Sequence, residues 1–546
     1  MCLAAVANAA GATRADAPTV AVTQTLTGLN DITAGGYEPP DVQVAAGPGF
    51  VVEMVNLAAR TWRTATGAPA QQAQTIDLAT FFGTGGDRLT DPRVIYDTAS
   101  SRWFASIADV DSNSVKLAVS HSTDPTAAWS TYSFAAAGCP DQPRLGVADG
   151  IVVLAADVFS SCDESFAPLF GAELWVVNKA QLVAGAPTVA SFTYGPDHAY
   201  TSLAPVQSLS PTGTEYAVSV DSPSSRVVHL LTVDGIPPAA VRVQAVASLP
   251  ISPLTEPPPG QQPSSSGSRR PPVIETNDNR VLDSVWEDGK LWFSANDGCV
   301  PSGDTSLRSC GRVVELATAT RTVTWDTELS QPGAHVFYPA LQPDGSGNLV
   351  LVYGESSVAI LPELVTVARL PDGTFTAPAV FAQSAGTYNG DRFGDYFGAA
   401  RDPSSPGLVW VAGEQGVDIA GTRGWGTSVA SVQVNAAGAV TPPTINGSVV
   451  PGVRAQAVAG RVGSTVRLAY KVVDDSTGVR EKVTVTLKKK VVFKATTAAL
   501  AVRGGQVYYV RWHPAKKLRG TFTWCVTSVA ADGTQSPQSC STLKLR

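Results

Sequence analysis

Polar side chains precede several short apolar runs, where they could do chemistry if the fold brings them together. Asp91 and Arg93 stand before VIYD, and Asp141 and Arg144 stand before LGV. Carboxylates, guanidiniums and phenols that converge on one surface can hold a polar ligand such as a glycan or a peptide. The candidate ligand-binding residues are Asp41, Asp91, Arg93, Asp141, Arg144, Asp283, Tyr338, Asp395 and Tyr396.

A structural role is the alternative for these residues. In repeat folds, a residue that recurs at the start of each unit often ties that unit to its neighbour by hydrogen bonds. The Asp and Arg side chains in the matching contexts DPR and DQPR favour this role. Tyr338, Asp395 and Tyr396 recur less and are better ligand candidates.

Signatures of metal, nucleotide or serine catalysis are missing from the sequence. It contains no HExxH, no glycine-rich loop ending in Lys-Ser or Lys-Thr, and no GxSxG. The segment DVDSNS at 109–114 imitates the start of a calcium loop but lacks the required glycine and the final acid, so a polar hairpin turn is favoured. No catalytic residue, metal ligand or cofactor is predicted, and a structural calcium ion at the centre of the fold is left open.

Secondary-structure elements must position these residues. The β-branched and aromatic runs of the chain indicate an all-β fold. One unit recurs: a short strand, a tight turn and a strongly apolar strand. Its copies start 50 to 79 residues apart, which suits four-stranded blades with loop insertions. We predict a seven-bladed β-propeller over residues 25–440, with six or eight blades as alternatives. The copies begin at Asp41, Asp91, Asp141, Ala204, Asp283, Tyr338 and Phe397.

In a propeller, the residues just before each inner strand ring the top of the central channel, which is where the candidate residues stand. The longest gap between copies contains LTEPPPGQQPSSSGSRRPP at 254–272. Its Pro, Ser and Gly content predicts an exposed loop.

A second module follows a linker predicted at 441–452. Residues 453–546 contain about seven alternating runs, which predict a small β-sandwich. In KVTVTLKKK, Val483, Val485 and Leu487 should face the core while the Lys and Thr side chains face outward.

Charge separates the two modules. The net charge of -7 combines 22 basic and 42 acidic residues up to Val440 with 17 basic and 4 acidic residues after it. The basic module is a candidate for contact with a polyanion such as a cell-envelope polymer. Docking on the acidic propeller, or solubility alone, is the alternative. The candidate residues are Lys488, Lys489, Lys490, Lys494, Arg511, Lys516, Lys517 and Arg519.

The cysteines and the N-terminus indicate an extracytoplasmic compartment. Six of the seven cysteines fall into close pairs, and local disulfides are the simplest of about fifteen pairings. No pair has the spacing of a zinc knuckle. Residues 1–24 are interpreted as the tail of a secretory leader, or else as a disordered N-terminus. The pairs are Cys139 with Cys162, Cys299 with Cys310, and Cys525 with Cys540.

The segments DPRVIYDTASSRWFASI, CPDQPRLGVADGIVVLAADVF and RFGDYFGAARDPSSPGLVWVAGE resemble a family of secreted bacterial propeller proteins of sialidase-like fold. The tail, RGTFTWCVTSVAADGTQSPQSCSTLKLR, is similar to the end of an immunoglobulin-like or fibronectin-type module. The resemblance implies the fold and carries no agreed function.

The sialidase comparison can be followed to single residues. Ser122, Asp124 and Trp129 have the spacing of the Asp-box of sialidases, with Thr126 in place of its glycine. That box is structural, and the first arginine of the sialidase site is missing where this chain reads YEPPD.

We therefore predict a secreted, non-catalytic binding or surface-interaction protein, with a polar ligand on the propeller top face and the basic sandwich as an anchor or spacer. The alternative is a glycan-active glycoside hydrolase or polysaccharide lyase. The expected partner is a glycan, a peptide or a cell-envelope polymer. Nucleic acid and a membrane-spanning segment are not expected, and the protein is predicted to be a monomer.

Overall fold

The computed structural model divides into two compact units, residues 1–439 and 440–546. It describes residues 18–65, 68–164, 167–222, 224–263, 272–390, 392–419, 422–435, 453–472, 476–488, 490–497, 500–502, 507–515, 517–529, 535–536 and 538–546. The predicted linker 441–452 and residues 1–17 of the predicted leader lie outside these ranges. In the described part, strands dominate and the helices are the short α1 (Leu78–Phe82) and α2 (Lys179–Val183). No described helix is long and apolar enough to span a bilayer.

The first unit is built from antiparallel four-stranded meanders. They are β2 (Gln43–Gly47), β3 (Phe50–Val55), β4 (Ala58–Ala65) and β5 (Ala68–Asp77); β6 (Leu89–Asp97), β7 (Arg102–Asp109), β8 (Ser114–Ser120) and β9 (Trp129–Ala135); β10 (Cys139–Val147), β11 (Ile151–Phe159), β12 (Leu169–Asn178) and β13 (Ser191–Asp197); β14 (Ala204–Pro205), β16 (Glu215–Val220), β17 (Ser225–Asp234) and β18 (Arg242–Leu254); β19 (Val281–Glu287), β20 (Lys290–Cys299), β21 (Arg308–Ala317) and β22 (Thr322–Leu329); and β23 (His335–Pro343), β24 (Leu349–Ser356), β25 (Glu363–Arg369) and β26 (Ala379–Gln383).

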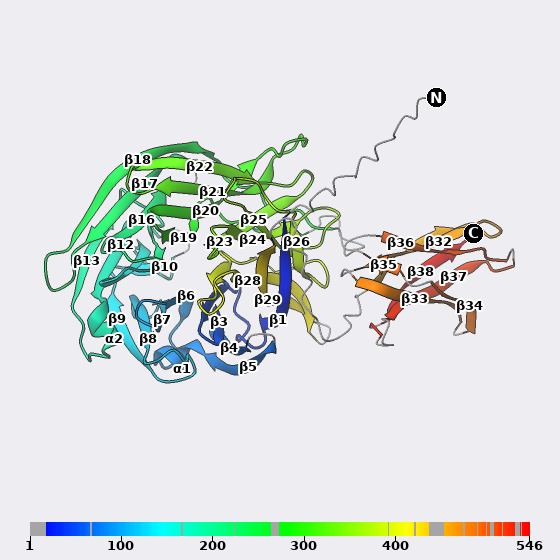
Figure 1. Ribbon diagram of the computed structural model, residues 1–546, viewed down its shortest axis with the longest axis horizontal. Coiled ribbons are helices and arrows are strands. Elements are labelled where there is room, and N and C mark those ends of the chain that lie inside the picture. Colours follow the sequence, from blue (N-terminus) through cyan, green and yellow to red (C-terminus); the bar gives the residue numbers. More distant parts are fainter. Residues whose placement is uncertain are drawn as a thin grey trace, which may run out of the picture. The chain divides into compact units, whose positions relative to one another are not determined.

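The first strands of the meanders form a ring, which Figure 1 shows around a common centre. β2 contacts β6, β6 contacts β10, and the series continues through β14, β19 and β23 to β27 (Gly398–Arg401), which returns to β2. The short β15 (Gln207–Ser208) bridges β10 and β19 in parallel register. Because each meander packs against a neighbour on both faces, its second strand is buried along nearly its whole length and is mostly apolar, as in FVVEMV and IVVLAADVF. We call residues 18–435 the propeller-like unit.

The N-terminal strand closes the ring. β1 (Thr19–Asn30) pairs with β29 (Thr422–Asn435), which is followed across the sheet by β28 (Leu408–Ile419) and β27. This strand begins six residues before the predicted boundary at residue 25, because residues 19–24 alternate along the edge of β29 and belong to the sheet. Pairing the two ends of the unit closes the ring without leaving an open gap between its first and last sheets.

Glu53 ties this closing sheet to the first meander. Its Oε2 accepts the N–H of Leu29 at 3.1 Å, and its Oε1 is hydrogen-bonded to Thr427. The side chain is fully buried, and burial raises the pKa of Glu53 to about 7.

Glu53→Gln is expected to make stability less dependent on pH. The folded pKa lies above the unfolded value of about 4.5, so the contribution of Glu53 is complete below that value and falls as pH rises through 7. Between pH 5 and 8 the wild type should lose about 2–3 kcal/mol relative to Glu53→Gln. Urea denaturation at a series of pH values measures this, and parallel stability curves would contradict it.

The segment at 254–272 differs from the exposed loop predicted for it. In its described residues, 254–263 and 272, Leu254, Pro257, Gly260 and Gln262 are buried. The amide of Gln262 donates to Tyr388 O at 3.0 Å and accepts from Tyr388 N at 2.8 Å. The side-chain amide of Gln262 thus pairs with the backbone of Tyr388 as a neighbouring strand would. The Pro-rich composition of the segment does not indicate this contact.

The second unit has two sheets over one core of Leu468, Tyr470, Val485, Trp512 and Trp524 and their neighbours. The predicted alternation is confirmed, since Val483 and Val485 are buried while Lys482 and Lys488 are exposed. The strands are β30 (Val453–Ala455), β32 (Val466–Val472) and β36 (Val507–Trp512) in one sheet, and β31 (Val458–Gly460), β38 (Ser539–Leu545), β37 (Gly520–Val529), β33 (Ser476–Leu487) and β34 (Lys490–Thr496) in the other, with β35 (Leu500–Val502) on β33.

The disulfides join Cys139 to Cys162, Cys299 to Cys310 and Cys525 to Cys540, as the local-pairing hypothesis predicts. Three disulfides are consistent with an extracytoplasmic protein.

Candidate functional site

The residues that begin the inner strands adopt an unusual backbone conformation. Asp41, Asp91, Gln142 and Tyr338 have positive φ angles of 53°, 60°, 44° and 53°. The last three each lie within a β-bulge, where the register of the inner strand shifts against its neighbour. A bulge turns a side chain out of the strand's regular alternation, so it can aim these residues at the centre of the ring.

An asparagine on the second strand of the preceding meander, or directly after that strand, holds the backbone of Asp91 and of Tyr338. We call the residues at the starts of the inner strands the leading residues. Asn56 Oδ1 accepts the N–H of Asp91 at 2.7 Å, and Asn296 Oδ1 accepts the N–H of Tyr338 at 2.7 Å. Asn56 also donates to Asp41 Oδ2 at 2.6 Å. These bonds join successive meanders. Tying one unit to the next is the structural role predicted as the alternative for the recurring residues.

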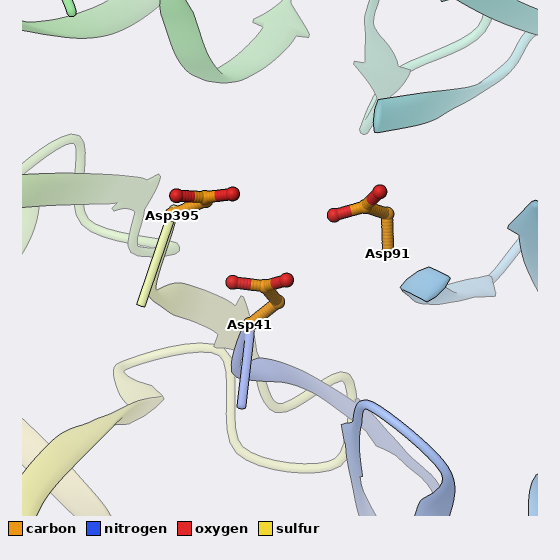
Figure 2. Close-up of side chains that lie close together, drawn as sticks. All are labelled: Asp41, Asp91 and Asp395. Atoms are coloured by element: carbon orange, nitrogen blue, oxygen red, sulfur yellow. The ribbon is translucent and has the colours of Figure 1, made fainter. Parts of the chain in front are cut away.

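Three leading acids meet at the centre of the ring. Asp41, Asp91 and Asp395 each place a carboxylate oxygen within 4.8 Å of the others, and all three are buried (Figure 2). They come from before β2, from β6 and from before β27, far apart in the sequence. We call these three residues the acidic cluster.

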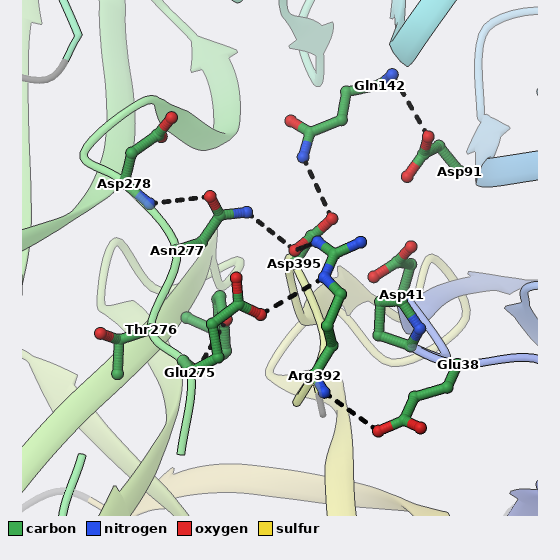
Figure 3. A network of polar contacts seen from close by, with 12 residues as sticks. Glu38, Asp41, Asp91, Gln142, Glu275, Thr276, Asn277, Asp278, Arg392 and Asp395 are labelled. Carbon is green, nitrogen blue, oxygen red and sulfur yellow. Dashed lines mark hydrogen bonds and ion pairs between the residues drawn. The ribbon is translucent and has the colours of Figure 1, made fainter. Parts of the chain in front are cut away.

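A polar network surrounds the acidic cluster (Figure 3). Asp395 accepts from Asn277 at 2.7 Å, from Gln142 at 3.4 Å, and from Arg392. Asp91 Oδ2 accepts the N–H of Gln142 at 3.3 Å. Asp41 Oδ1 has no hydrogen-bond partner although it is buried.

Burial in this network raises the pKa of the acids. The pKa of Asp41 is raised well above its usual range by burial and then by Asp395 and Asp91. Burial and Asp395 raise the pKa of Asp91, and burial and Asp91 raise the pKa of Asp141 to about 7. The cluster therefore holds more negative charge than its buried environment favours.

Two residues after Asp91 and Gln142 along their inner strands, the side chains are positively charged. Arg93 and Arg144 are buried, and both donate to the carbonyl of Leu282, at 3.4 and 2.6 Å. Arg93 also stacks on Tyr396, 3.5 Å from the ring centroid. Neither arginine has an ion pair among the described residues, and Nε and Nη2 of Arg93 and Nε of Arg144 lack acceptors. Burial, with Arg93 next, lowers the pKa of Arg144 to about 9.

These arginines line a cavity of about 340 Å³ that runs along the inner strands toward the turns at Thr98 and Pro403. Polar groups from Gln43, Gln207 and Asp283 also line it. The acidic cluster is not among its walls.

The predicted ligand residues therefore separate into two groups. Arg93, Arg144 and Asp283 line the cavity, and Asp283 Oδ2 also accepts the N–H of Leu341 at 3.0 Å. The acidic cluster and the two tyrosines lie in the polar network, where Tyr338 donates to Glu275 O and Tyr396 donates to Pro92 O, each at 3.0 Å. Asp141 lies 3.7 Å from Arg280.

Sequence reasoning missed Gln142, Asn277 and Arg392. Gln142, rather than its neighbour Asp141, occupies the place equivalent to Asp91, because Gln142-Pro143-Arg144 aligns with Asp91-Pro92-Arg93. That shared X-Pro-Arg pattern could have identified it. Asn277 follows the Pro-rich segment and carried no repeat signal.

The other motifs are turns. Asp124 Oδ1 accepts from Thr126 N at 2.9 Å in the Asp-box hairpin, and Asp109 Oδ1 accepts from Ser112 N at 3.1 Å in DVDSNS.

The basic candidates of the second unit lie at its surface. Lys488, Lys490, Lys494, Arg511, Lys517 and Arg519 are exposed, and Lys489 and Lys516 lie outside the described residues.

No protein-family model and no curated protein matches the chain. Similar solved structures include a protein of unknown function from Dyadobacter fermentans, 12% identical over 77% of this chain and 100% of that one, with a TM-score of 0.36. A Hadza microbial sialidase is 10% identical over 71% and 73%, with a TM-score of 0.35. A Bombyx mori β-fructofuranosidase is 12% identical over 84% and 86%, with a TM-score of 0.29. Sialidases and glycoside hydrolases are thus among the structures that this chain is similar to, at low identity and low TM-score.

Proposed function

We propose that this is a secreted, non-catalytic binding or surface-interaction protein whose propeller-like unit holds a small acidic ligand, such as an acidic glycan or peptide. The observation that carries the proposal is the cavity lined by Arg93 and Arg144, two buried cations without an ion pair in the described protein. Secretion is supported by the three disulfides.

The physical reason is charge compensation. Two buried guanidiniums that share one carbonyl repel each other, and an anion between or beside them offsets that repulsion. A carboxylate suits a guanidinium because it accepts two parallel hydrogen bonds. The cavity volume of about 340 Å³ is at the small end for ligand pockets, which favours a single sugar or a short peptide end.

Binding of D-glucuronate, with D-glucose as the neutral control, tests the proposal by isothermal titration calorimetry. The wild type is expected to bind glucuronate and not glucose, and Arg93→Met should weaken glucuronate binding at least tenfold because the charge is removed. Lys290→Met, an exposed cation on β20, should leave it unchanged. Equal binding of the two sugars, or unchanged binding by Arg93→Met, would contradict the proposal.

The proposal includes the fold of each unit. We take the meanders and the closing sheet as a seven-bladed β-propeller over residues 19–435, and the second unit as an immunoglobulin-like sandwich over 453–546. The exposed cations of that sandwich support a role as an anchor on an anionic cell-envelope polymer. Docking of the sandwich on the acidic propeller remains the alternative use of the same charge.

A glycan-active hydrolase or lyase is the second candidate. The observation that favours it is the Tyr388 hydroxyl, which donates to Glu38 Oε1 at 2.6 Å near Arg392, as in a tyrosine–glutamate nucleophile pair. Against it, burial and Glu414 raise the pKa of Tyr388, which disfavours the nucleophilic phenolate. Turnover of fluorogenic glycosides that Asp395→Asn abolishes would establish this function over the binding role.

A further inference from the structure

We infer that the acidic cluster of Asp41, Asp91 and Asp395 binds a calcium ion at the centre of the ring. This site is separate from the arginine-lined cavity and goes beyond the proposed binding function. No residue of the cluster lines that cavity.

The geometry suits one shared ion. The three carboxylates face a common space in Figure 2, with an oxygen of each within 4.8 Å of the others. Calcium binds oxygen ligands at about 2.3–2.6 Å, so two oxygens on one ion are at most about 5 Å apart. Calcium also tolerates irregular coordination, which suits ligands from three separate segments better than the strict octahedron of magnesium.

Unpartnered oxygens supply the independent observation. Asp41 is 1% exposed, and its Oδ1 has no hydrogen-bond partner, although a buried carboxylate oxygen normally finds one. Glu414, on β28, is 1% exposed, and neither of its oxygens has a partner. Its Oε2 lies 3.4 Å from where a Cβ on Gly394, next to Asp395, would be.

The cations among the described residues balance this charge only in part. Arg392 donates to Asp395 and also pairs with Glu275 at 3.4 Å. Asp41 and Asp91 have no ion pair among the residues that the structure describes. Buried charges are normally paired or bound to metals, and a divalent cation would provide the missing charge.

The position of the ligands gives the ion a structural role. Asp41 leads into the first meander, Asp91 lies in the second, and Asp395 precedes the last inner strand. An ion bound by all three joins the start and the end of the ring. Because binding to the folded state alone stabilises it, calcium should raise the unfolding temperature of the propeller-like unit.

The test uses the full-length protein after EDTA treatment and dialysis, titrated with CaCl2 by calorimetry and followed by thermal unfolding. We expect calcium binding and a higher unfolding temperature, with at least tenfold weaker binding in Asp41→Asn. The matched control is Asp344→Asn, a buried acid in the turn between β23 and β24, which should bind calcium like the wild type. Magnesium at the same concentration should bind at least tenfold more weakly.

Terbium luminescence provides a test that needs no variant. Tyr338 and Tyr396 stand among the same leading residues and can sensitise Tb³⁺ bound in the cluster. Excess calcium should displace the Tb³⁺ and thereby abolish its sensitised emission. Absence of calcium binding and of any thermal shift in the wild type would overturn the inference, as a proton shared by the acids would then account for the cluster. Unchanged affinity in Asp41→Asn would overturn it as well.

Discussion

Arg312→Met is expected to lower the free energy of unfolding of the propeller-like unit by about 3–5 kcal/mol, because it leaves the buried carboxylate of Asp297 without its cation. Arg312 on β21 is 3% exposed and bonds Asp297 Oδ2 through Nη2 at 2.6 Å and Nε at 3.1 Å. It also reaches Asp326 and Glu328 on β22, each at 3.1 Å. Asp297 is fully buried, so water cannot replace the lost cation.

Denaturation by guanidinium chloride measures this effect through the transition midpoint. Arg88→Met is the matched control, since Arg88 pairs with Asp111 at 2.8 Å at the surface and exposed ion pairs contribute little. Adding Asp297→Asn to Arg312→Met should recover part of the loss, because the stranded charge disappears. Equal midpoints for the two arginine variants would show that Asp297 is not held in a buried pair.

The inner strands could be predicted from sequence because each copy of the repeat carries its own signal. Asp91, Asp141, Asp283 and Tyr338 all fall within observed first strands, and Ala204 begins β14. Local apolar runs separated by turn residues are enough for that, since each hairpin is formed by neighbours in the chain.

The closing strand could not be predicted in the same way. β1 pairs Thr19 with Asn435 and Leu26 with Val429, and nothing in the residues 19–30 specifies a partner at the other end of the unit. The choice of the edge on which such a strand pairs depends on how the whole ring closes.

Most residues of the candidate site could be predicted, apart from Gln142, Asn277 and Arg392, but their arrangement could not. Alternation along a strand places Asp91 and Arg93 on the same face, yet it cannot tell that one belongs to a buried cluster and the other to a cavity wall. The bulges decide this, and they also exchange Asp141 for Gln142. A one-residue shift of that kind leaves the hydrophobic pattern of the strand almost unchanged.

The packing between meanders depends on close approaches that a repeat pattern does not display, and Trp103 against Gly47 is the clearest of them. Trp103 is fully buried on β7, where its Nε1 donates to Thr123 O at 2.9 Å and its ring lies 5.0 Å from that of Tyr96. A Cβ on Gly47, in the neighbouring β2, would lie 2.5 Å from the Trp103 ring. The glycine therefore provides the space that the indole fills.

Trp103→Ala is expected to cost about 3–5 kcal/mol of unfolding free energy, as large-to-small changes in a packed core do. Gly47→Ala alone should cost about 1–3 kcal/mol by overpacking. In the Trp103→Ala background the indole clash is gone and only the buried ring of Tyr96, whose Cδ2 would lie 2.9 Å from the same Cβ, must shift, so Gly47→Ala should cost clearly less than it does in the wild type. Denaturant unfolding of all four proteins gives the coupling energy, with Gly213→Ala, whose Cβ would meet nothing within 4 Å, as the control in both backgrounds. Additive effects of Gly47→Ala and Trp103→Ala would mean that the contact between the first two meanders does not rest on this pair.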